Sequence, residues 1–266
     1  MMSNSHEAIN MATLFDLTGK TALVTGGSRG IGRMIAHGYL QAGATVFISS
    51  RKADACKQAA DELSTAGPCH ALPADISLDA DRERLVAALG ERTRQLDVLV
   101  NNAGAAWGAP FESFPTTGFR KILDLNVTAL FFLTRDLTPL LTAAARENNP
   151  ARVINIGSMD GLKAPTVLKT GTFPYSASKA AVHHLTRSLA LELAPRHITV
   201  NAVAPGFFES KMTEQPLAQF RVEIEQNCPL HRIGRPEEMA GVAIYLASRA
   251  GAYTNGVVIP VDGGTS

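Results

Sequence analysis

The sequence predicts an α/β protein: a doubly wound parallel sheet flanked by helices, in a single domain. Apolar runs recur along the chain with amphipathic, helix-like stretches between them, and this alternation is typical of parallel strands joined by right-handed crossovers. The interiors of several runs are almost continuous in Val, Ile and Leu, which is the pattern of strands buried on both faces. No linker, repeat or low-complexity tract divides the 266 residues, and this length suits one large α/β domain.

Each apolar run is expected to form a strand, and the runs cover residues 21–25, 45–50, 69–74, 97–104, 152–158, 198–206 and 256–264. Helices are expected between them: GRMIAHGYLQAG follows the first run, and ADACKQAADELSTAG, from near Asp54 to Gly67, follows the second. Residues 1–16 are largely polar and lack the basic and apolar regions of a signal peptide. We expect a flexible N-terminal extension there, ahead of one domain over 17–266.

The composition argues against several classes of protein. The net charge of +1 and the pI near 7.8 provide no basic surface for nucleic acid. Cys56, Cys69 and Cys228 are far apart and form no CxxC pair, which suits a reducing, cytoplasmic compartment. They have no metal-ligand spacing with the histidines, and no apolar run approaches the ~20 residues of a membrane span. We therefore expect no metal, no nucleic-acid partner and no membrane association.

Glycines cluster at the end of the first expected strand, in TGGSRGIG (25–32). A strand that ends in such a turn and leads into a helix points backbone N–H groups and the positive helix end at one spot, where a pyrophosphate fits. The spacing, Gly26-x-x-x-Gly30-x-Gly32, differs from the general Gly-x-Gly-x-x-Gly fingerprint. On its own the cluster is also compatible with a tight strand-to-helix turn that binds nothing.

The second expected strand ends in Ser49, Ser50 and Arg51. A unit that prefers NAD usually carries an acidic residue about twenty positions after the glycines, where it binds the ribose 2′-hydroxyl. No acid is present at this strand end. Arg51, together with Arg29 in the glycine turn, suits a 2′-phosphate instead, because a guanidinium offers several fixed donors. The pattern favours NADP(H) as the cofactor, and the alternative is a pair of solvated surface arginines.

The sequence YSASK places Tyr175 and Lys179 four residues apart at the start of a strongly helical stretch, so the two side chains share a helix face. A phenol has a pKa of about 10, and a neighbouring ammonium favours the phenolate and lowers that value. Ser158, at the end of the run RVINIGS, supplies a hydroxyl that can hold a carbonyl oxygen against Tyr175. By itself a Tyr–Lys pair is also compatible with a surface helix.

In these motifs the chain resembles the short-chain dehydrogenase/reductase family, in the branch that includes 3-oxoacyl reductases. The resemblance runs from about Leu17 to Gly264 and rests on TGGSRGIG (25–32), Asp75, NNAG (101–104), Asn126 in DLNVT, Ser158, YSASK (175–179) and APGFFESKM (204–212). It implies a seven-stranded Rossmann sheet. The catalytic group that it implies is Asn126, Ser158, Tyr175 and Lys179.

The resemblance implies a role for each of these four residues. Tyr175 donates a proton to the carbonyl oxygen as hydride reaches the carbon, and Ser158 hydrogen-bonds the same oxygen. Lys179 lowers the pKa of Tyr175 and holds the nicotinamide ribose. Asn126 binds, through its helix, a water that relays protons towards Lys179.

The resemblance also implies where the cofactor lies. Asp75 is expected to accept a hydrogen bond from the adenine amine, NNAG to line the floor under the adenine ribose, and segment 205–210 to hold the carboxamide. The implied cofactor contacts are Gly26, Ser28, Arg29, Gly30, Ile31, Gly32, Ser50, Arg51, Asp75, Ile76, Asn102, Ala103, Gly104, Tyr175, Lys179, Pro205, Gly206, Phe208 and Ser210.

One stretch departs from the family pattern. The expected catalytic serine and tyrosine are 17 positions apart, several more than usual, and the extra residues fall in the loop 162–174 beside the expected substrate carbonyl. The family's substrate therefore does not carry over directly. Lys163 and Lys169 in this loop either meet an anionic carrier or are solvated. Trp107, the only tryptophan, either walls the pocket or packs locally.

The leading functional hypothesis is an NADPH-dependent ketoreductase, with 3-oxoacyl thioesters as the first substrates to test. The alternatives are an alcohol or sugar-acid dehydrogenase and a regulator that senses NADPH without turnover, although a sensor has no need of the Tyr–Lys pair. Two helical stretches, near 118–146 and 175–194, and the last strand are more apolar than one sheet face requires. The family pairs subunits through these elements, so a homotetramer is expected.

Overall fold

Seven parallel strands form a single sheet in the computed structural model, which describes residues 10–165 and 171–266. The order across the sheet is β3-β2-β1-β4-β5-β6-β7, and every neighbouring pair is parallel. The strands are β1 (Thr21–Thr25), β2 (Thr45–Ser49), β3 (Cys69–Ala71), β4 (Val98–Asn101), β5 (Ala151–Ile156), β6 (Ile198–Pro205) and β7 (Val258–Val261). The predicted seven-stranded sheet is confirmed, although β3 and β7 are shorter than their apolar runs.

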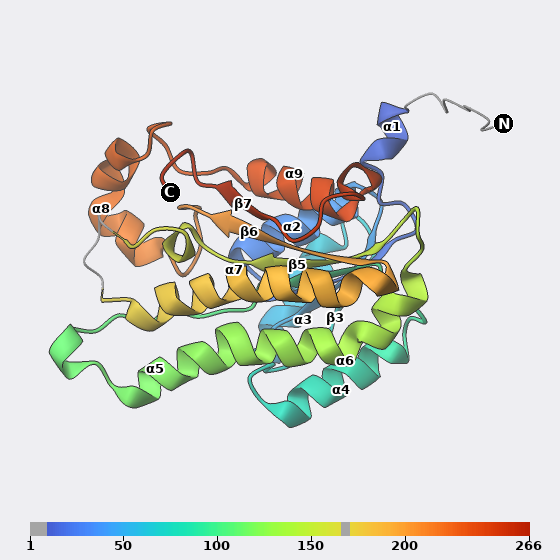
Figure 1. Cartoon of the computed structure of the whole chain (residues 1–266), viewed down its shortest axis with the longest axis horizontal. Coiled ribbons are helices and arrows are strands. Elements are labelled where there is room, and N and C mark those ends of the chain that lie inside the picture. The colour runs from blue at the N-terminus through green and yellow to red at the C-terminus, as the bar shows by residue number, and fades with distance from the viewer. Residues whose placement is uncertain (1–9, 166–170) are drawn as a thin grey trace.

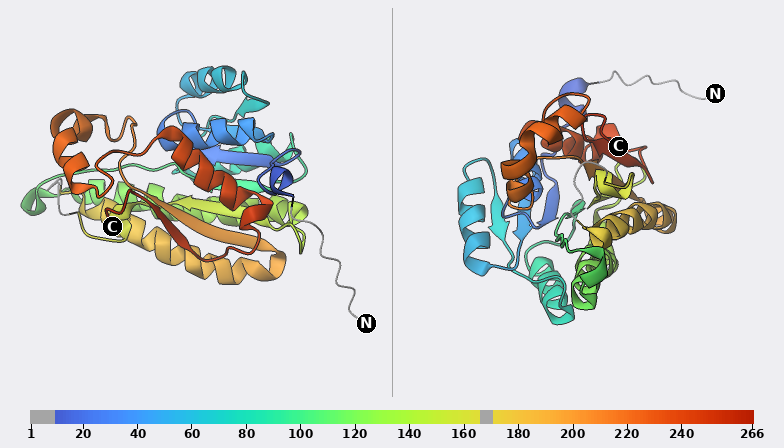
Figure 2. Two further views of the ribbon diagram at one scale, coloured as in Figure 1. Left: turned by 90° about the horizontal axis from the view of Figure 1, so that it is seen from above. Right: turned by 90° about the vertical axis from the view of Figure 1, so that its left-hand side faces the viewer.

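Helices cover both faces of the sheet (Figures 1 and 2). On one face, buried side chains of α2 (Gly30–Gln41), α3 (Ala53–Leu63) and α9 (Pro236–Ala247) share a core with the strands. On the other face, a second core joins the strands to α4 (Asp79–Gly90), α6 (Ala129–Ala144) and α7 (Phe173–Leu193). This two-sided burial explains why the strands are apolar throughout rather than alternating.

Two further helices belong to neither of these cores. The four-residue α1 (Met11–Leu14) precedes the sheet, and α8 (Glu214–Asn227) lies between β6 and α9. Of the predicted extension, residues 1–9 lie outside the described residues, and Leu17 is fully buried with its N–H bonded to the Ala42 carbonyl at 2.9 Å. Ordered packing of the chain against the sheet therefore begins by Leu17.

Helix α5 (Thr116–Leu123) continues into α6 through a π-helical turn, Asp124–Thr128. The resulting 29-residue run is the one helix in the described residues that is long and apolar enough to cross a membrane by length and composition alone, with a mean hydropathy of 1.2. Its most apolar part is 44% buried within the molecule. In this fold it packs against α4 and α7, as the core helix of a layered α/β protein does.

The order of the strands reverses between β1 and β4, because the chain runs outward from β1 to β3 and then returns to the centre. In open parallel sheets, ligands bind at such a switch point, outside the carboxyl ends of the strands. The start of α5, helix α8 and the C-terminal residues lie together at one end of the molecule (Figures 1 and 2). The motifs singled out from the sequence lie at this same carboxyl edge.

Candidate active site

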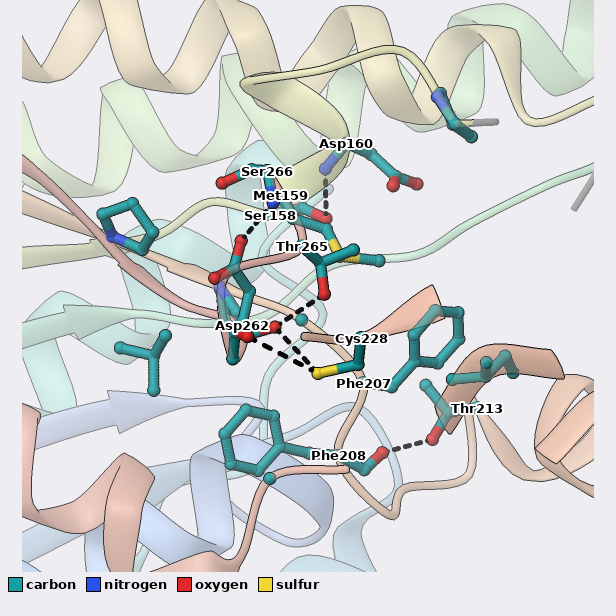
Figure 3. Close-up of a pocket in the computed structure, with 18 of the residues that line it drawn as sticks. Ser158, Met159, Asp160, Phe207, Phe208, Thr213, Cys228, Asp262, Thr265 and Ser266 are labelled. Atoms are coloured by element: carbon teal, nitrogen blue, oxygen red, sulfur yellow. Dashed lines mark hydrogen bonds between the residues drawn. The ribbon is translucent and has the colours of Figure 1, made fainter. Parts of the chain in front are cut away.

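A cavity of about 710 Å³ opens at the carboxyl edge of the sheet. Its wall combines Ser158 and Tyr175 with mainly apolar side chains, among them Phe207, Phe208, Met212 and Ile224. The close-up in Figure 3 shows the C-terminal residues Asp262, Thr265 and Ser266 near Ser158 in this wall. The cavity is thus an apolar chamber with a few polar groups at one side, the usual composition of a small-molecule site.

The predicted Ser–Tyr–Lys group comes together from two neighbouring elements. Ser158 follows the end of β5 by two residues and caps a short 3₁₀ turn, where its Oγ accepts a hydrogen bond from the Asp160 N–H at 3.2 Å. Tyr175 and Lys179 lie one turn apart near the start of α7. The Ser158 hydroxyl hydrogen-bonds the Tyr175 side chain, and the Lys179 ammonium lies 5.5 Å from the centre of the Tyr175 ring. The structure therefore brings together the three residues that the sequence predicted.

The protonation of this group follows from its burial. Desolvation raises the pKa of Tyr175 to about 12; the hydrogen bond with Ser158 opposes this increase and the negative charge of Asp160 adds to it. Burial lowers the pKa of Lys179 to about 8, and its ammonium donates to the Ile156 carbonyl at 2.7 Å. Where a lowered Tyr175 pKa was expected, desolvation therefore raises it in this arrangement.

Asn126 lies in the π-helical turn and connects the floor of the site to α7. Its Nδ2 donates to the Ala105 carbonyl at 3.0 Å and to the Ser178 hydroxyl at 2.9 Å, and its Oδ1 accepts from the Ala105 N–H at 3.0 Å. Ser178 in turn donates to the Tyr175 carbonyl at 2.7 Å. The side chain of Asn126 is therefore fully used in positioning the helix that carries Tyr175, and a water relay through its backbone stays a prediction.

The glycine turn after β1 forms a cradle that side chains would fill. Gly26 and Gly30 have φ values of +65° and +53°, in the left-handed region that favours glycine. A Cβ at Gly26 would lie 2.6 Å from Asn102 Nδ2, and one at Gly32 would lie 2.5 Å from the Gly26 carbonyl oxygen. Helix α2 begins here without a side-chain cap at Arg29, so its first N–H groups are available to a diphosphate.

The end of β2 carries polar groups without partners. The hydroxyls of Ser49 and Ser50 are buried and form no hydrogen bond in the described part of the chain. Arg29 and Arg51 are exposed, and neither forms an ion pair with any residue the structure describes. Buried polar groups without partners are rare in native proteins, so the two hydroxyls and the Arg51 guanidinium at the end of β2, with Arg29 in the glycine turn, fit a ribose 2′-phosphate.

Thr25, at the end of β1, connects the glycine turn to the NNAG segment. Its Oγ1 accepts from the Asn102 and Ala103 N–H groups, both at 3.0 Å, and the Asn102 side chain donates to the Thr25 carbonyl at 2.8 Å. A Cβ at Gly104 would be 3.7 Å from Lys179 Nζ. NNAG therefore forms a continuous floor from the glycine turn to Lys179.

The predicted adenine contacts lie one strand further out. Asp75 follows β3, and its Oδ1 accepts from the N–H and hydroxyl of Ser77 at 3.1 and 2.7 Å. Its second oxygen has no hydrogen bond or ion pair with any residue that the structure describes, and Ile76 beside it is 5% exposed. The adenine contact of Asp75 stays a prediction.

The segment after β6 closes over the glycine turn from the opposite side. A Cβ at Gly30 would lie 3.0 Å from the Cβ of Ser210, and one at Gly206 would lie 2.8 Å from the Cα of Asp262. Phe208 is 2% exposed, and its carbonyl accepts from Thr213. Pro205, Gly206 and Phe208 line the cavity, so the segment lies between the cradle and the chamber. Its contact with the nicotinamide carboxamide stays a prediction.

The lengthened loop contributes less to the site than its lysines suggested. Lys163 is exposed and donates to the Thr265 carbonyl at 3.3 Å, while Lys169 lies outside the described residues. Trp107 packs near Gly118, with the Lys121 ammonium 5.9 Å from its ring centre. Trp107 is not among the cavity-lining residues of the described chain, so local packing is the reading that the structure favours.

Sequence reasoning missed Thr25, Ser178 and Asp160. Ser178 lies within the YSASK motif, and Asp160 lies two positions after Ser158. The distance of Ser178 from Tyr175 along the helix was a usable signal, because residues three apart share a face. The position of Asp160 in a turn gave no such signal, since only the tertiary structure brings it into the cavity wall.

The fold and this site define an oxidoreductase, and the chain belongs to the short-chain dehydrogenase/reductase family. A family described as enoyl-(acyl carrier protein) reductase matches residues 26–266. A Pseudomonas aeruginosa protein, the rhamnolipids biosynthesis 3-oxoacyl-(acyl-carrier-protein) reductase, is 52% identical over 257 residues, covering 96% of this chain and 99% of that protein. The Escherichia coli 5-keto-D-gluconate 5-reductase is 34% identical over 258 residues, covering 96% of this chain and 98% of that protein.

Solved structures agree with this assignment. The Pseudomonas aeruginosa RhlG/NADP active-site complex has a TM-score of 0.90 and 52% identity, covering 95% of this chain and 98% of that one. A gluconate 5-dehydrogenase from Burkholderia cenocepacia in complex with NADP and tartrate has a TM-score of 0.88 and 29% identity, covering 96% of this chain and 98% of that one. Reductases of acyl-carrier substrates and of sugar acids are therefore both represented among the relatives.

Proposed function

We propose that this protein is an NADPH-dependent ketoreductase that reduces the 3-oxo group of an acyl thioester to a secondary alcohol. The observation that carries the proposal is the placement of Ser158 and Tyr175, with Lys179 behind them, at the wall of a largely apolar cavity. Apolar walls suit an acyl chain, whereas a sugar acid needs hydrogen-bond partners for each buried hydroxyl. The 3-oxoacyl reductase activity named for the 52% identical relative supports the same substrate class.

The chain's own residues supply the proton and hold the carbonyl group. Ser158 donates a hydrogen bond to the substrate carbonyl oxygen and positions it beside the Tyr175 hydroxyl. Tyr175 carries its proton at neutral pH, because its pKa is raised to about 12, and it gives that proton to the oxygen as negative charge develops there. Lys179, buried and adjacent on α7, stabilises the tyrosinate that remains.

NADPH supplies the hydride when it is bound. The glycine cradle at Gly26, Gly30 and Gly32 with the uncapped start of α2 fits its diphosphate, and Ser50 with Arg51 fits its 2′-phosphate. Relatives whose structures contain NADP support the choice of this cofactor.

The direct test is a panel of carbonyl compounds assayed by loss of NADPH absorbance. We expect turnover of 3-oxoacyl thioesters, such as acetoacetyl-CoA and 3-oxodecanoyl thioesters, and little or none of 5-ketogluconate. Preferential reduction of 5-ketogluconate would favour the sugar-acid alternative, and absence of turnover with every ketone would refute the ketoreductase proposal.

We further propose a cytoplasmic homotetramer. Cys56, Cys69 and Cys228 are free and buried, as in proteins of reducing compartments. The outer surface of α6 and α7 exposes Phe131 (38%) and Leu191 (80%), and β7 is an edge strand whose residues are only partly covered. Apolar helix faces and open sheet edges are commonly covered by another subunit.

A further inference from the structure

Five charged side chains line the cavity, and four of them are already engaged. Arg232 and Glu238 form a two-fold ion pair at 2.9 and 2.5 Å. Both oxygens of Asp262 accept backbone N–H groups of the C-terminal residues at 2.9 Å. Lys163 donates to a backbone carbonyl at the outer end of the cavity. The fifth is Asp160.

The carboxylate of Asp160 has no hydrogen bond or ion pair with any residue in the described ranges, 10–165 and 171–266. Only its backbone N–H is bound, to the Ser158 hydroxyl. Figure 3 shows the two residues side by side in the cavity wall. An acidic group without a counter-charge therefore lies two residues from the hydroxyl that holds the substrate carbonyl.

Asp160 lies close enough to Tyr175 for its charge to contribute to the raised pKa of the phenol. Burial raises the pKa of Asp160 itself to about 6, and above that pH the carboxylate is ionised. The turn that carries Asp160 packs against α7, where the neighbouring Gly161 lies close to the Lys179 backbone and the His183 ring. The ammonium groups of Lys163 and Lys179 are bound to carbonyls elsewhere.

We propose that Asp160 is a specificity-determining residue that excludes anionic ketones and restricts this cavity to uncharged carbonyl substrates, such as 3-oxoacyl thioesters. A carboxylate brought into the chamber loses hydration, gains no free cation among the described lining residues, and meets a like charge beside the reaction centre. A thioester carries no charge at the same place. The inference rests on the proposed ketoreductase function and names the feature that separates acyl from sugar-acid substrates.

The test compares one ketone in two charge states, 4-oxopentanoate and its methyl ester. The quantity measured is the ratio of kcat/KM for the acid to kcat/KM for the ester, at about pH 8, where Asp160 is ionised. Because both values come from the same variant, any general change in catalysis cancels in the ratio. We expect wild type to prefer the ester, and Asp160→Asn to raise the ratio by about tenfold or more, as charges several ångströms apart imply.

Two variants serve as controls. Asp160→Glu keeps the charge and should keep the wild-type preference for the ester. Glu83→Gln removes an exposed carboxylate on α4, outside the cavity wall, and should leave the ratio unchanged. A change of the ratio in Glu83→Gln equal to that in Asp160→Asn would overturn the proposal, because it would show a general charge effect.

The proposal is also overturned if wild type prefers the acid, or if Asp160→Asn leaves the ratio unchanged. If wild type reduces neither compound, the ketone panel described above tests the ketoreductase proposal separately. Calorimetric titration of the same acid and ester into wild type and Asp160→Asn then decides the role of Asp160. Tighter binding of the acid to the variant than to wild type, with unchanged binding of the ester, supports that role. Equal binding of the acid to both proteins refutes it.

Discussion

At the scale of single residues, Tyr175 is subject to opposing influences. Burial and the charge of Asp160 raise its pKa, and Ser158 lowers it. The net effect holds the phenol protonated over the physiological pH range, which suits a residue that must give a proton to a carbonyl oxygen. Oxidation of an alcohol needs the opposite, a phenolate that accepts a proton.

The Tyr175→Phe variant should fold and bind NADPH while losing turnover, because only the hydroxyl is removed. A general acid typically contributes about 100- to 10,000-fold in rate, and we expect a loss of kcat in this range. Fluorescence titration with NADPH and steady-state assays check both parts. Near-normal activity would show that another group donates the proton.

Arg51→Asp tests the choice of cofactor at the end of β2. We expect a shift from NADPH towards NADH of roughly 10- to 150-fold in the ratio of kcat/KM values, since charge-assisted hydrogen bonds are worth ~1.5–3 kcal/mol. The matched control is Arg94→Asp, an exposed arginine between α4 and β4. Wild-type preference for NADH at equal concentrations would contradict the assignment.

The residues of the site differ in how far the sequence revealed them. Ser158, Tyr175 and Lys179 were predictable because their chemistry and their spacing point to one reaction. The engagement of Lys179 with the Ile156 carbonyl was not, because it depends on the position of β5 relative to α7. Asp160 was missed for the same reason: its importance comes from what surrounds it in space.

At the scale of elements, the junction of β1 and α2 is the most constrained part of the fold. A Cβ at Gly32 would collide with the Gly26 carbonyl and with the amide of Asn102. Neither neighbour moves easily, since the Asn102 amide is bonded to the Thr25 carbonyl. The alternation of strands and helices was readable from the sequence, whereas the π-helical turn at Asp124–Thr128 was not, because it serves a tertiary contact of Asn126.

Gly32→Ala should therefore lower the free energy of unfolding by about 1–3 kcal/mol, the usual cost of overpacking, and weaken NADPH binding. The matched control is Gly241→Ala in α9, where an added Cβ meets nothing within 4 Å; there we expect a gain of about 0.4–1 kcal/mol. Urea denaturation measures both. Equal effects of the two substitutions would show that the cradle is not tightly packed.

At the scale of the whole molecule, the exposed apolar residues of α6 and α7 form the surface through which we propose that subunits associate. Light scattering at micromolar concentration should give about four times the chain mass of 28.2 kDa. Leu191→Glu, on the exposed face of α7, should reduce that mass, while Val222→Glu on α8 should leave it unchanged; both side chains are exposed in the single chain, at 80% and 67%. A wild-type mass near that of one chain would refute the tetramer.

The cradle proposed for the cofactor and the wall of the cavity come from different parts of the chain. The glycine cradle, the end of β2 and NNAG all come from the first 104 residues, whereas most of the cavity wall comes from residues 205–266. Substitutions after residue 210, in about the last fifth of the chain, can therefore reshape the chamber without replacing a residue of the cradle or of the Ser–Tyr–Lys group. For protein engineering this means that a library confined to residues 212–230 and 260–266 would sample new substrates while the cradle, the segment 205–210 and the Ser–Tyr–Lys group keep their residues.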